Sequence, residues 1–139
     1  MERFAFRKLD VYAEAMMLVK QVHRLARMVP REHMDLVWQL RRAVRSILLN
    51  IAEGAGEFAP KEKARIYRIA RRSAWETVAA LDIAIEEGLL TLQDIMPTLD
   101  LLNRVIGRLT TMGKRAEARA PRPRPHPRKT KDDVRRPPK

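Results

Sequence analysis

Hydrophobic residues recur at helical spacing in four consecutive segments of this 139-residue chain, and only short links separate the segments. Steps of three and four residues place side chains on one face of an α-helix, whereas a β-strand requires strict alternation, which this sequence lacks. Short links between long helices make neighbouring helices antiparallel. The sequence therefore predicts an all-α fold, an antiparallel up-down-up-down four-helix bundle.

Proline and glycine mark the boundaries of the first three expected helices. The first helix is expected from about Leu9 to Met28, Pro30 can begin the second, and Ala59-Pro60 opens the third, because proline is tolerated in a first turn. Gly54 and Gly56 are expected to end the second helix, because glycine adopts the left-handed conformation at little cost.

The fourth helix has a start signal and one complication. Gly88 is expected to cap the third helix just before it, and Thr91 with Asp94 three residues later resembles a capping box. Pro97 lies too deep for a first turn that begins at Thr91. We therefore expect either a kink at Pro97 or a later helix start.

Each helix carries a hydrophobic stripe that we assign to the core. The first helix has two such stripes, and the one assigned to the core comprises Tyr12, Met16, Val19, His23 and Ala26. The second stripe recurs every seven residues and is assigned to subunit contacts; it comprises Val11, Leu18 and Leu25. The core residues expected from the other helices are Leu36, Leu40, Val44, Ile47, Ile51, Ile66, Ala70, Ser73, Thr77, Leu81, Ala84, Ile95, Leu99, Leu102, Ile106 and Leu109.

Positive charge is concentrated in the C-terminal segment. The chain has a formal net charge of +12, and residues 115–139 hold ten of its 29 Lys and Arg residues but only three of its 17 Asp and Glu residues. This segment is also rich in proline and nearly free of large hydrophobic groups, so it cannot offset its ordering entropy by burial. We expect a bundle over residues 1–114 and a disordered basic tail over residues 115–139.

Tryptophan and arginine share the predicted outward faces of the second and third helices. Trp38 and Leu49 point away from the core stripe of the second helix, and Trp75 does so on the third. Outward hydrophobic faces on several helices favour subunit contacts. Stacking of nucleic-acid bases on the indole rings is a second interpretation.

Arginines on these faces and in the tail are the candidate nucleic-acid contacts, because guanidinium groups bind phosphate in bidentate fashion. The alternative is that the helical arginines pair with acids on neighbouring helices, such as Glu14, Glu76 or Asp82, and that the tail is a solvated end without a partner. The candidate residues are Arg41, Arg42, Arg45, Arg68, Arg71, Arg72, Arg122, Arg124 and Arg128.

A polar strip follows one further side of the second helix. It comprises Gln39, Ser46, Asn50 and Glu53, at spacings of seven, four and three. We interpret it as a structural seam that satisfies buried polar groups and sets the helix register, with Asn50 and Glu53 bonding the helix end at Gly54. The alternative, in which Glu53 is a catalytic acid or a metal ligand, is less favoured.

Several classes of function lack their sequence signatures. The chain has no cysteine, no secretory leader at its N-terminus and no hydrophobic run of about 20 residues. We therefore expect a soluble cytoplasmic protein. The two serines, three histidines and five glycines do not form a nucleophile elbow, a di-iron pattern or a phosphate-binding loop. Neither an enzymatic activity nor a cofactor or metal site is expected.

The segment from Gln39 to Gly56 resembles the signature of the four-helix-bundle proteins encoded in intervening sequences of bacterial 23S rRNA genes. The resemblance extends over roughly residues 4–112. Phe6, Leu9-Asp10-Val11-Tyr12, Ser73 with Glu76, and Ala84 with Gly88-Leu89 add to it. It implies a subunit that assembles into a ring, a pentamer, without enzymatic activity. A related bundle is the accessory variability determinant of diversity-generating retroelements, which partners a reverse transcriptase and binds nucleic acid.

Two functional hypotheses follow from these features. The first is a non-enzymatic, ring-forming bundle that binds RNA, or an RNA–protein complex, through arginines and the basic tail. The second is a scaffold that serves as the accessory subunit of a reverse transcriptase in a diversity-generating retroelement.

Overall fold

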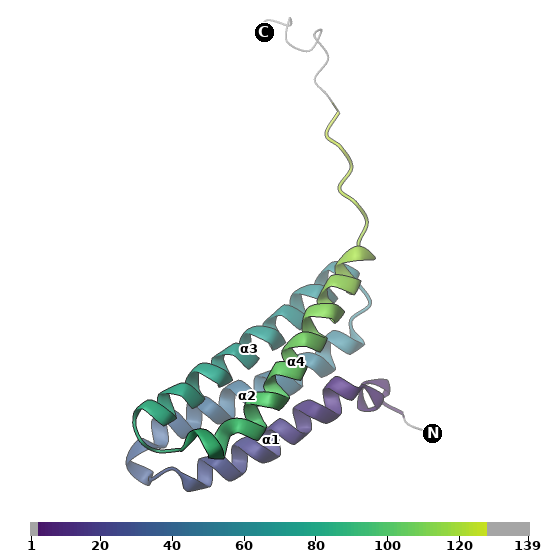
Figure 1. Ribbon diagram of the computed structural model, residues 1–139. Coiled ribbons are helices and arrows are strands. Elements are labelled where there is room, and N and C mark those ends of the chain that lie inside the picture. Colours follow the sequence, from purple (N-terminus) through teal and green to yellow (C-terminus); the bar gives the residue numbers. More distant parts are fainter. Residues whose placement is uncertain (1–2, 128–139) are drawn as a thin grey trace, which may run out of the picture.

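Four long α-helices make up the computed structural model, which describes residues 3–127. They are α1 (Asp10–Met28), α2 (Met34–Gly56), α3 (Pro60–Glu86) and α4 (Leu92–Ala118), with short 3-10 helices η1 (Ala5–Lys8) and η2 (Arg31–His33) before α1 and α2. Consecutive helices run antiparallel and pack side by side (Figure 1). The predicted all-α, up-down-up-down bundle is confirmed.

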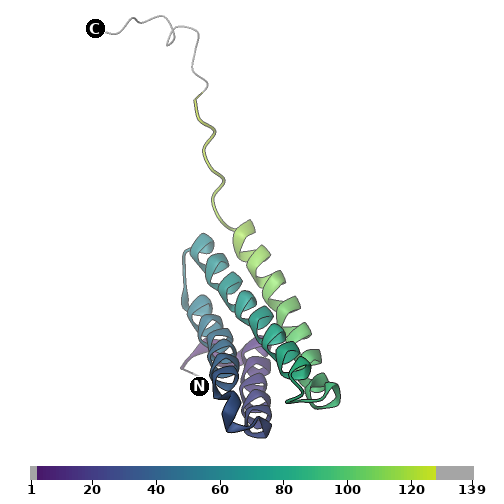
Figure 2. The same ribbon diagram turned by 90° about the vertical axis from the view of Figure 1, so that its left-hand side faces the viewer.

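The last helix continues beyond the expected domain boundary at residue 114. α4 ends at Ala118, and residues 121–127 have neither helix nor strand and run away from the bundle (Figure 2). Residues 115–118 therefore belong to the bundle. The remainder of the expected tail, residues 128–139, lies outside the described residues.

The α3–α4 turn has the capping that the sequence predicts. Gly88 has a φ of 72°, and the backbone N–H of Leu89 donates to the carbonyl of Ala84 over 2.8 Å, so glycine supplies the left-handed residue that ends α3. Thr91 and Asp94 form a reciprocal capping box at the start of α4. The Thr91 backbone N–H donates to the Asp94 carboxylate and lowers the pKa of Asp94.

Pro97 lies inside α4 and does not delay its start. The helix begins at Leu92, so the expected later start is wrong. The hydrogen bond that Pro97 cannot donate would have gone to the carbonyl of Gln93. Both residues are exposed. Water can therefore satisfy that carbonyl.

α2 ends at Gly56, but neither Gly54 nor Gly56 adopts the conformation that was expected to end it. Within the described residues only Gly88 has a positive φ, so the left-handed conformation predicted for these two glycines is wrong. A Cβ built on Gly54 would lie 2.5 Å from Cε1 of Tyr67, whereas one on Gly56 would meet nothing within 4 Å. Gly54 is therefore required for the close approach of α3.

The predicted core stripes of α2 and α3 are buried throughout, whereas the stripe assigned to the core in α1 is only partly correct: Ala26 is buried, and Tyr12 and Val19 pack half-buried against the core. His23 from that stripe is exposed. The stripe assigned to subunit contacts, Val11, Leu18 and Leu25, is at most 2 % exposed and lies in the core. Ala15 and Val22 complete it at alternating steps of four and three, which is the stronger core pattern. These three residues therefore do not lie at a subunit interface.

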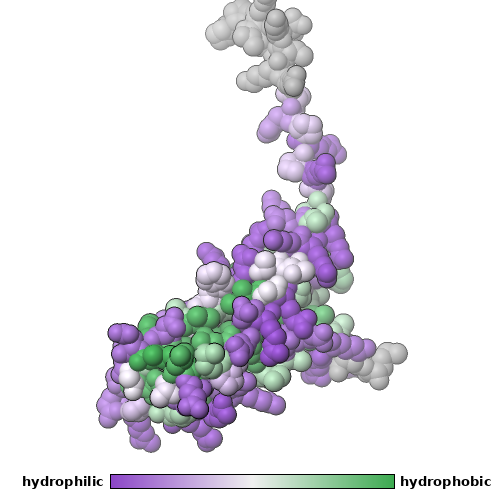
Figure 3. Space-filling model, viewed as in Figure 1, coloured by the Kyte–Doolittle hydropathy of each residue, from purple (hydrophilic) through white to green (hydrophobic). Residues whose placement is uncertain are grey.

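Some large hydrophobic side chains stay outside this core. Figure 3 shows hydrophobic residues gathered where α3 and α4 meet at their connecting turn. Ile83, Leu92 and Met96 are exposed in this region. We call these three residues the turn patch.

Candidate nucleic-acid interface

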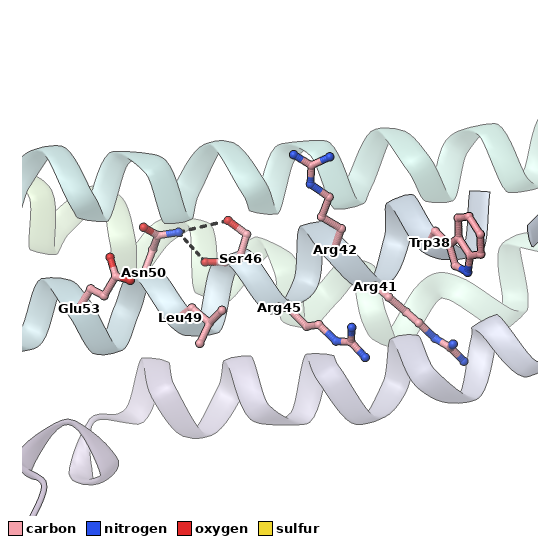
Figure 4. A pocket seen from close by; sticks show the side chains of 8 residues that line it. All are labelled: Trp38, Arg41, Arg42, Arg45, Ser46, Leu49, Asn50 and Glu53. Carbon is pink, nitrogen blue, oxygen red and sulfur yellow. Dashed lines mark hydrogen bonds between the residues drawn. The ribbon is translucent and has the colours of Figure 1, made fainter. Parts of the chain in front are cut away.

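A shallow groove of about 550 Å³ follows the outward face of α2 (Figure 4). The core residues of α2 recur at steps of three and four, so the residues between them face outward. Trp38 is 68 % exposed, and Leu49 is exposed about three turns further along. The groove is lined by Trp38, Arg41, Arg42, Arg45, Ser46, Leu49, Asn50 and Glu53. The structure thus brings the candidate arginines and hydrophobic residues of α2 together.

The three arginines of this groove spread over the width of α2. Arg42 extends toward α3, whereas Arg41 and Arg45 lie on the side of α1 (Figure 4). Among the described residues, none of the three has a carboxylate within 4.0 Å. Nε of Arg41 is buried and has no hydrogen-bond partner among those residues. An anion could satisfy this donor, because a buried unpaired N–H costs free energy.

A second basic surface lies on α3. Trp75 is 64 % exposed and lines a hollow of about 340 Å³ with Arg71, Arg72 and Thr110. Over residues 3–127 no carboxylate lies within 4.0 Å of Arg71 or Arg72. Together with the α2 groove, this surface presents five guanidinium groups that have no carboxylate partner within residues 3–127, beside two exposed indole rings.

Arg68 differs from the other candidate arginines because it is paired. Its Nη2 donates to Oε2 of Glu117 on α4 over 2.5 Å. The pairing predicted as an alternative therefore holds for Arg68, although Glu117 was not among the expected acids. Glu14, which was among them, accepts hydrogen bonds from Arg108 at 2.9 and 3.0 Å.

Of the four residues predicted to form a polar seam, only Ser46 and Asn50 make hydrogen bonds there. The Ser46 and Ser73 hydroxyls share a 2.7 Å hydrogen bond between α2 and α3. Nδ2 of Asn50 donates to the backbone carbonyl and the hydroxyl of Ser46, at 2.8 and 3.1 Å. Gln39 and Glu53 are exposed, so assigning them to a buried seam is wrong. Ser46 and Asn50 can set the register of α2 against α3.

Lys63 has the role at the end of α2 that Asn50 and Glu53 were expected to have. Its Nζ donates to the carbonyls of Gly54 and Ala55, at 2.6 and 3.2 Å. Burial lowers the pKa of Lys63, which Glu57 partly opposes. The position of Lys63 in the first turn of α3 is the one sequence signal for this role. A cation is unfavourable at the N-terminus of a helix and favourable near the carbonyls at the C-terminus of the preceding helix.

Replacing Lys63 with methionine should lower the free energy of unfolding by about 1 kcal/mol, because two charge-assisted bonds to helix-end carbonyls are lost. Lys61→Met removes the same charge from an exposed site in the same turn and should change it little. Urea unfolding of both variants checks this. Equal losses would show that the bonds of Lys63 do not stabilise α2.

The tail arginines are only partly described. Arg122 and Arg124 are exposed in the segment that follows α4. Arg128 lies outside the described residues. Arg122 and Arg124 therefore extend the positive charge of the bundle from the end of α4.

Residues 3–127 contain neither a cluster of metal-ligating side chains nor a membrane-spanning helix. No group of three or more His, Cys, Asp or Glu side chains is placed to hold a metal ion within this range. In the same range, none of the helices combines the length and the hydrophobicity needed to cross a bilayer.

Comparison with known proteins agrees with this bundle. Residues 7–111 match the family model described as 23S rRNA-intervening sequence protein. No curated protein matches the chain. The match covers α1, α2, α3 and most of α4, including the groove and the hollow at Trp75. The chain therefore belongs to the family of 23S rRNA-intervening sequence proteins.

Proposed function

We propose that this protein is a non-enzymatic, cytoplasmic bundle that assembles into a ring, a pentamer, and binds RNA or an RNA–protein complex. The observation that carries the proposal is the set of unpaired arginines on α2 and α3 among the described residues, next to the exposed Trp38 and Trp75. RNA is the favoured nucleic acid because the family is named for 23S rRNA.

The physical argument rests on repetition of weak contacts. One exposed guanidinium bound to one phosphate contributes little free energy by itself. A ring repeats each arginine once per subunit, and linked sites gain affinity through effective concentration. Neutralising several phosphates also releases counterions, which makes the affinity depend steeply on salt.

Filter binding of a labelled single-stranded RNA at rising salt tests the proposal. We expect the logarithm of the affinity to fall linearly with the logarithm of salt, with a slope of about −0.7 for each phosphate contact. The Arg71→Gln/Arg72→Gln variant should bind more weakly and with a shallower slope. Arg108→Gln is the matched control, since Arg108 is paired with Glu14 on another face. The proposal would be overturned if the protein did not bind the RNA, or if its affinity did not change with salt concentration.

The turn patch favours a second candidate function. Ile83, Leu92 and Met96 are exposed large hydrophobic residues around the α3–α4 turn, and exposed hydrophobic areas often bind proteins. A scaffold for a reverse transcriptase would use a surface of this kind. A reverse transcriptase that stays bound to the protein after nuclease treatment, and is released by Leu92→Asp, would support the scaffold. Loss of the enzyme on nuclease treatment alone would favour RNA binding.

A further inference from the structure

A third basic cluster lies at the end of the bundle from which the tail departs. There the end of α4 lies beside the link between α2 and α3 (Figure 1). A hollow of about 180 Å³ at this end is lined by Lys63, Tyr67, Met112, Arg115, Ala116 and Arg119. Three of these six side chains are cationic, and they come from α3, from the last turn of α4 and from the residue that follows α4. We call this hollow the tail-end site.

The cations of the tail-end site form no close ion pair in the described part of the chain, although the charge of Glu57 acts on Lys63. No carboxylate there lies within 4.0 Å of Lys63, Arg115 or Arg119. Glu117, the acid nearest to them in α4, is paired with Arg68. Lys63 keeps one free donor, because an ammonium group has three and two bind carbonyls. The site therefore has unused positive charge and unused donors.

The lining of the tail-end site strengthens its attraction for an anion. The Tyr67 ring is buried, and Nζ of Lys63 lies 5.6 Å from the centre of that ring. Burial is the main cause that lowers the pKa of Lys63; Glu57 partly opposes it, and Arg119 lowers it further. An added negative charge would favour the charged form of Lys63, as Glu57 does. Charge–charge attraction is larger beside hydrophobic side chains than in bulk water. The hollow thus suits a compact anion that is singly or doubly charged.

The chain continues from this site with further arginines. Arg115 lies in the last turn of α4, Arg119 follows its last residue, and Arg122 and Arg124 come next on the segment beyond the helix. A polyanion with regularly spaced charges could contact the site and the segment at once. A free phosphate could occupy the hollow alone and would gain nothing from the segment.

We propose that the tail-end site holds a backbone phosphate of bound RNA, with Arg115 and Arg119 as its principal donors and with Arg122 and Arg124 extending the track. This inference rests on the proposed function and deepens it. It places an RNA contact at the end of the bundle, away from the Trp38 and Trp75 faces.

The test is RNA binding by the full-length Arg115→Gln/Arg119→Gln variant. Compared with the wild-type protein, its affinity for a labelled single-stranded RNA should fall about tenfold at low salt, and its salt slope should become shallower by about 0.7 to 1.4. Its native mass and unfolding midpoint should not change, because both side chains are exposed and unpaired within the described residues. Lys20→Gln/Arg104→Gln is the matched control, because it removes two exposed positive charges from α1 and α4 outside the site.

The outcomes separate this inference from the proposed function. If the wild-type protein binds RNA and the Arg115→Gln/Arg119→Gln variant keeps its affinity and slope, the tail-end site is wrong and the proposed function stands. If the control variant is weakened equally, only net charge matters and the site is again wrong. If the wild-type protein does not bind RNA, the proposed function fails and this inference fails with it.

Discussion

Replacing Gly54 with alanine is expected to lower the free energy of unfolding by about 1–3 kcal/mol, which is typical of overpacking in a tight core. The added Cβ would lie 2.5 Å from Cε1 and 2.8 Å from Cδ1 of Tyr67. The tyrosine cannot easily move aside because it is 5 % exposed and packs in the core. α2 and α3 must then separate, or the ring must leave its rotamer.

Gly56→Ala is the matched control for this prediction. It makes the same chemical change two residues later in the same helix, where a Cβ meets nothing within 4 Å. Alanine favours a helix over glycine by up to about 1 kcal/mol, so stability should stay level or rise slightly. Urea unfolding at one protein concentration compares the two variants. A Gly54→Ala variant as stable as Gly56→Ala would show that the approach of Tyr67 does not constrain position 54.

Local signals predicted most of the bundle. Thr91 with Asp94, and Gly88 after α3, were identified correctly because a cap involves residues close together in sequence. The core stripes of α2 and α3 were identified correctly because each of these helices has one dominant hydrophobic arc. α1 has two adjacent arcs, and spacing alone did not show that Val11, Leu18 and Leu25 face the core.

Contacts between side chains of different helices could not be predicted from the sequence. Arg68 and Glu117 are 49 residues apart, so only the packing of α3 on α4 reveals their ion pair. The clash that excludes a Cβ at Gly54 likewise depends on where the Tyr67 ring lies. Periodicity indicated the outward direction of Trp38 and Trp75 correctly. It could not indicate which neighbouring arginines would be left without an acidic partner.

If the proposed ring forms and binds RNA, the Trp38→Ala/Trp75→Ala variant is expected to lose that assembly and to bind RNA at least about 100-fold more weakly. Each indole can bury about 150–250 Å² at an interface, and tryptophan is among the residues that contribute most to subunit contacts. Native mass spectrometry should show a shift from the assembly to the 16.1 kDa protomer. Affinity should fall by a factor in the range of 10² to 10⁴, because a protomer loses the gain from linked sites.

Phe58→Ala supplies the control for this variant. Phe58 is 96 % exposed in the α2–α3 link, so the change removes an exposed aromatic ring without touching the groove or the α3 hollow. Mass and affinity should both be retained. A double tryptophan variant that keeps its mass but loses RNA affinity would mean that the indole rings stack on bases instead of joining subunits. A variant that keeps both properties would remove Trp38 and Trp75 from either role and leave the arginines to account for binding alone.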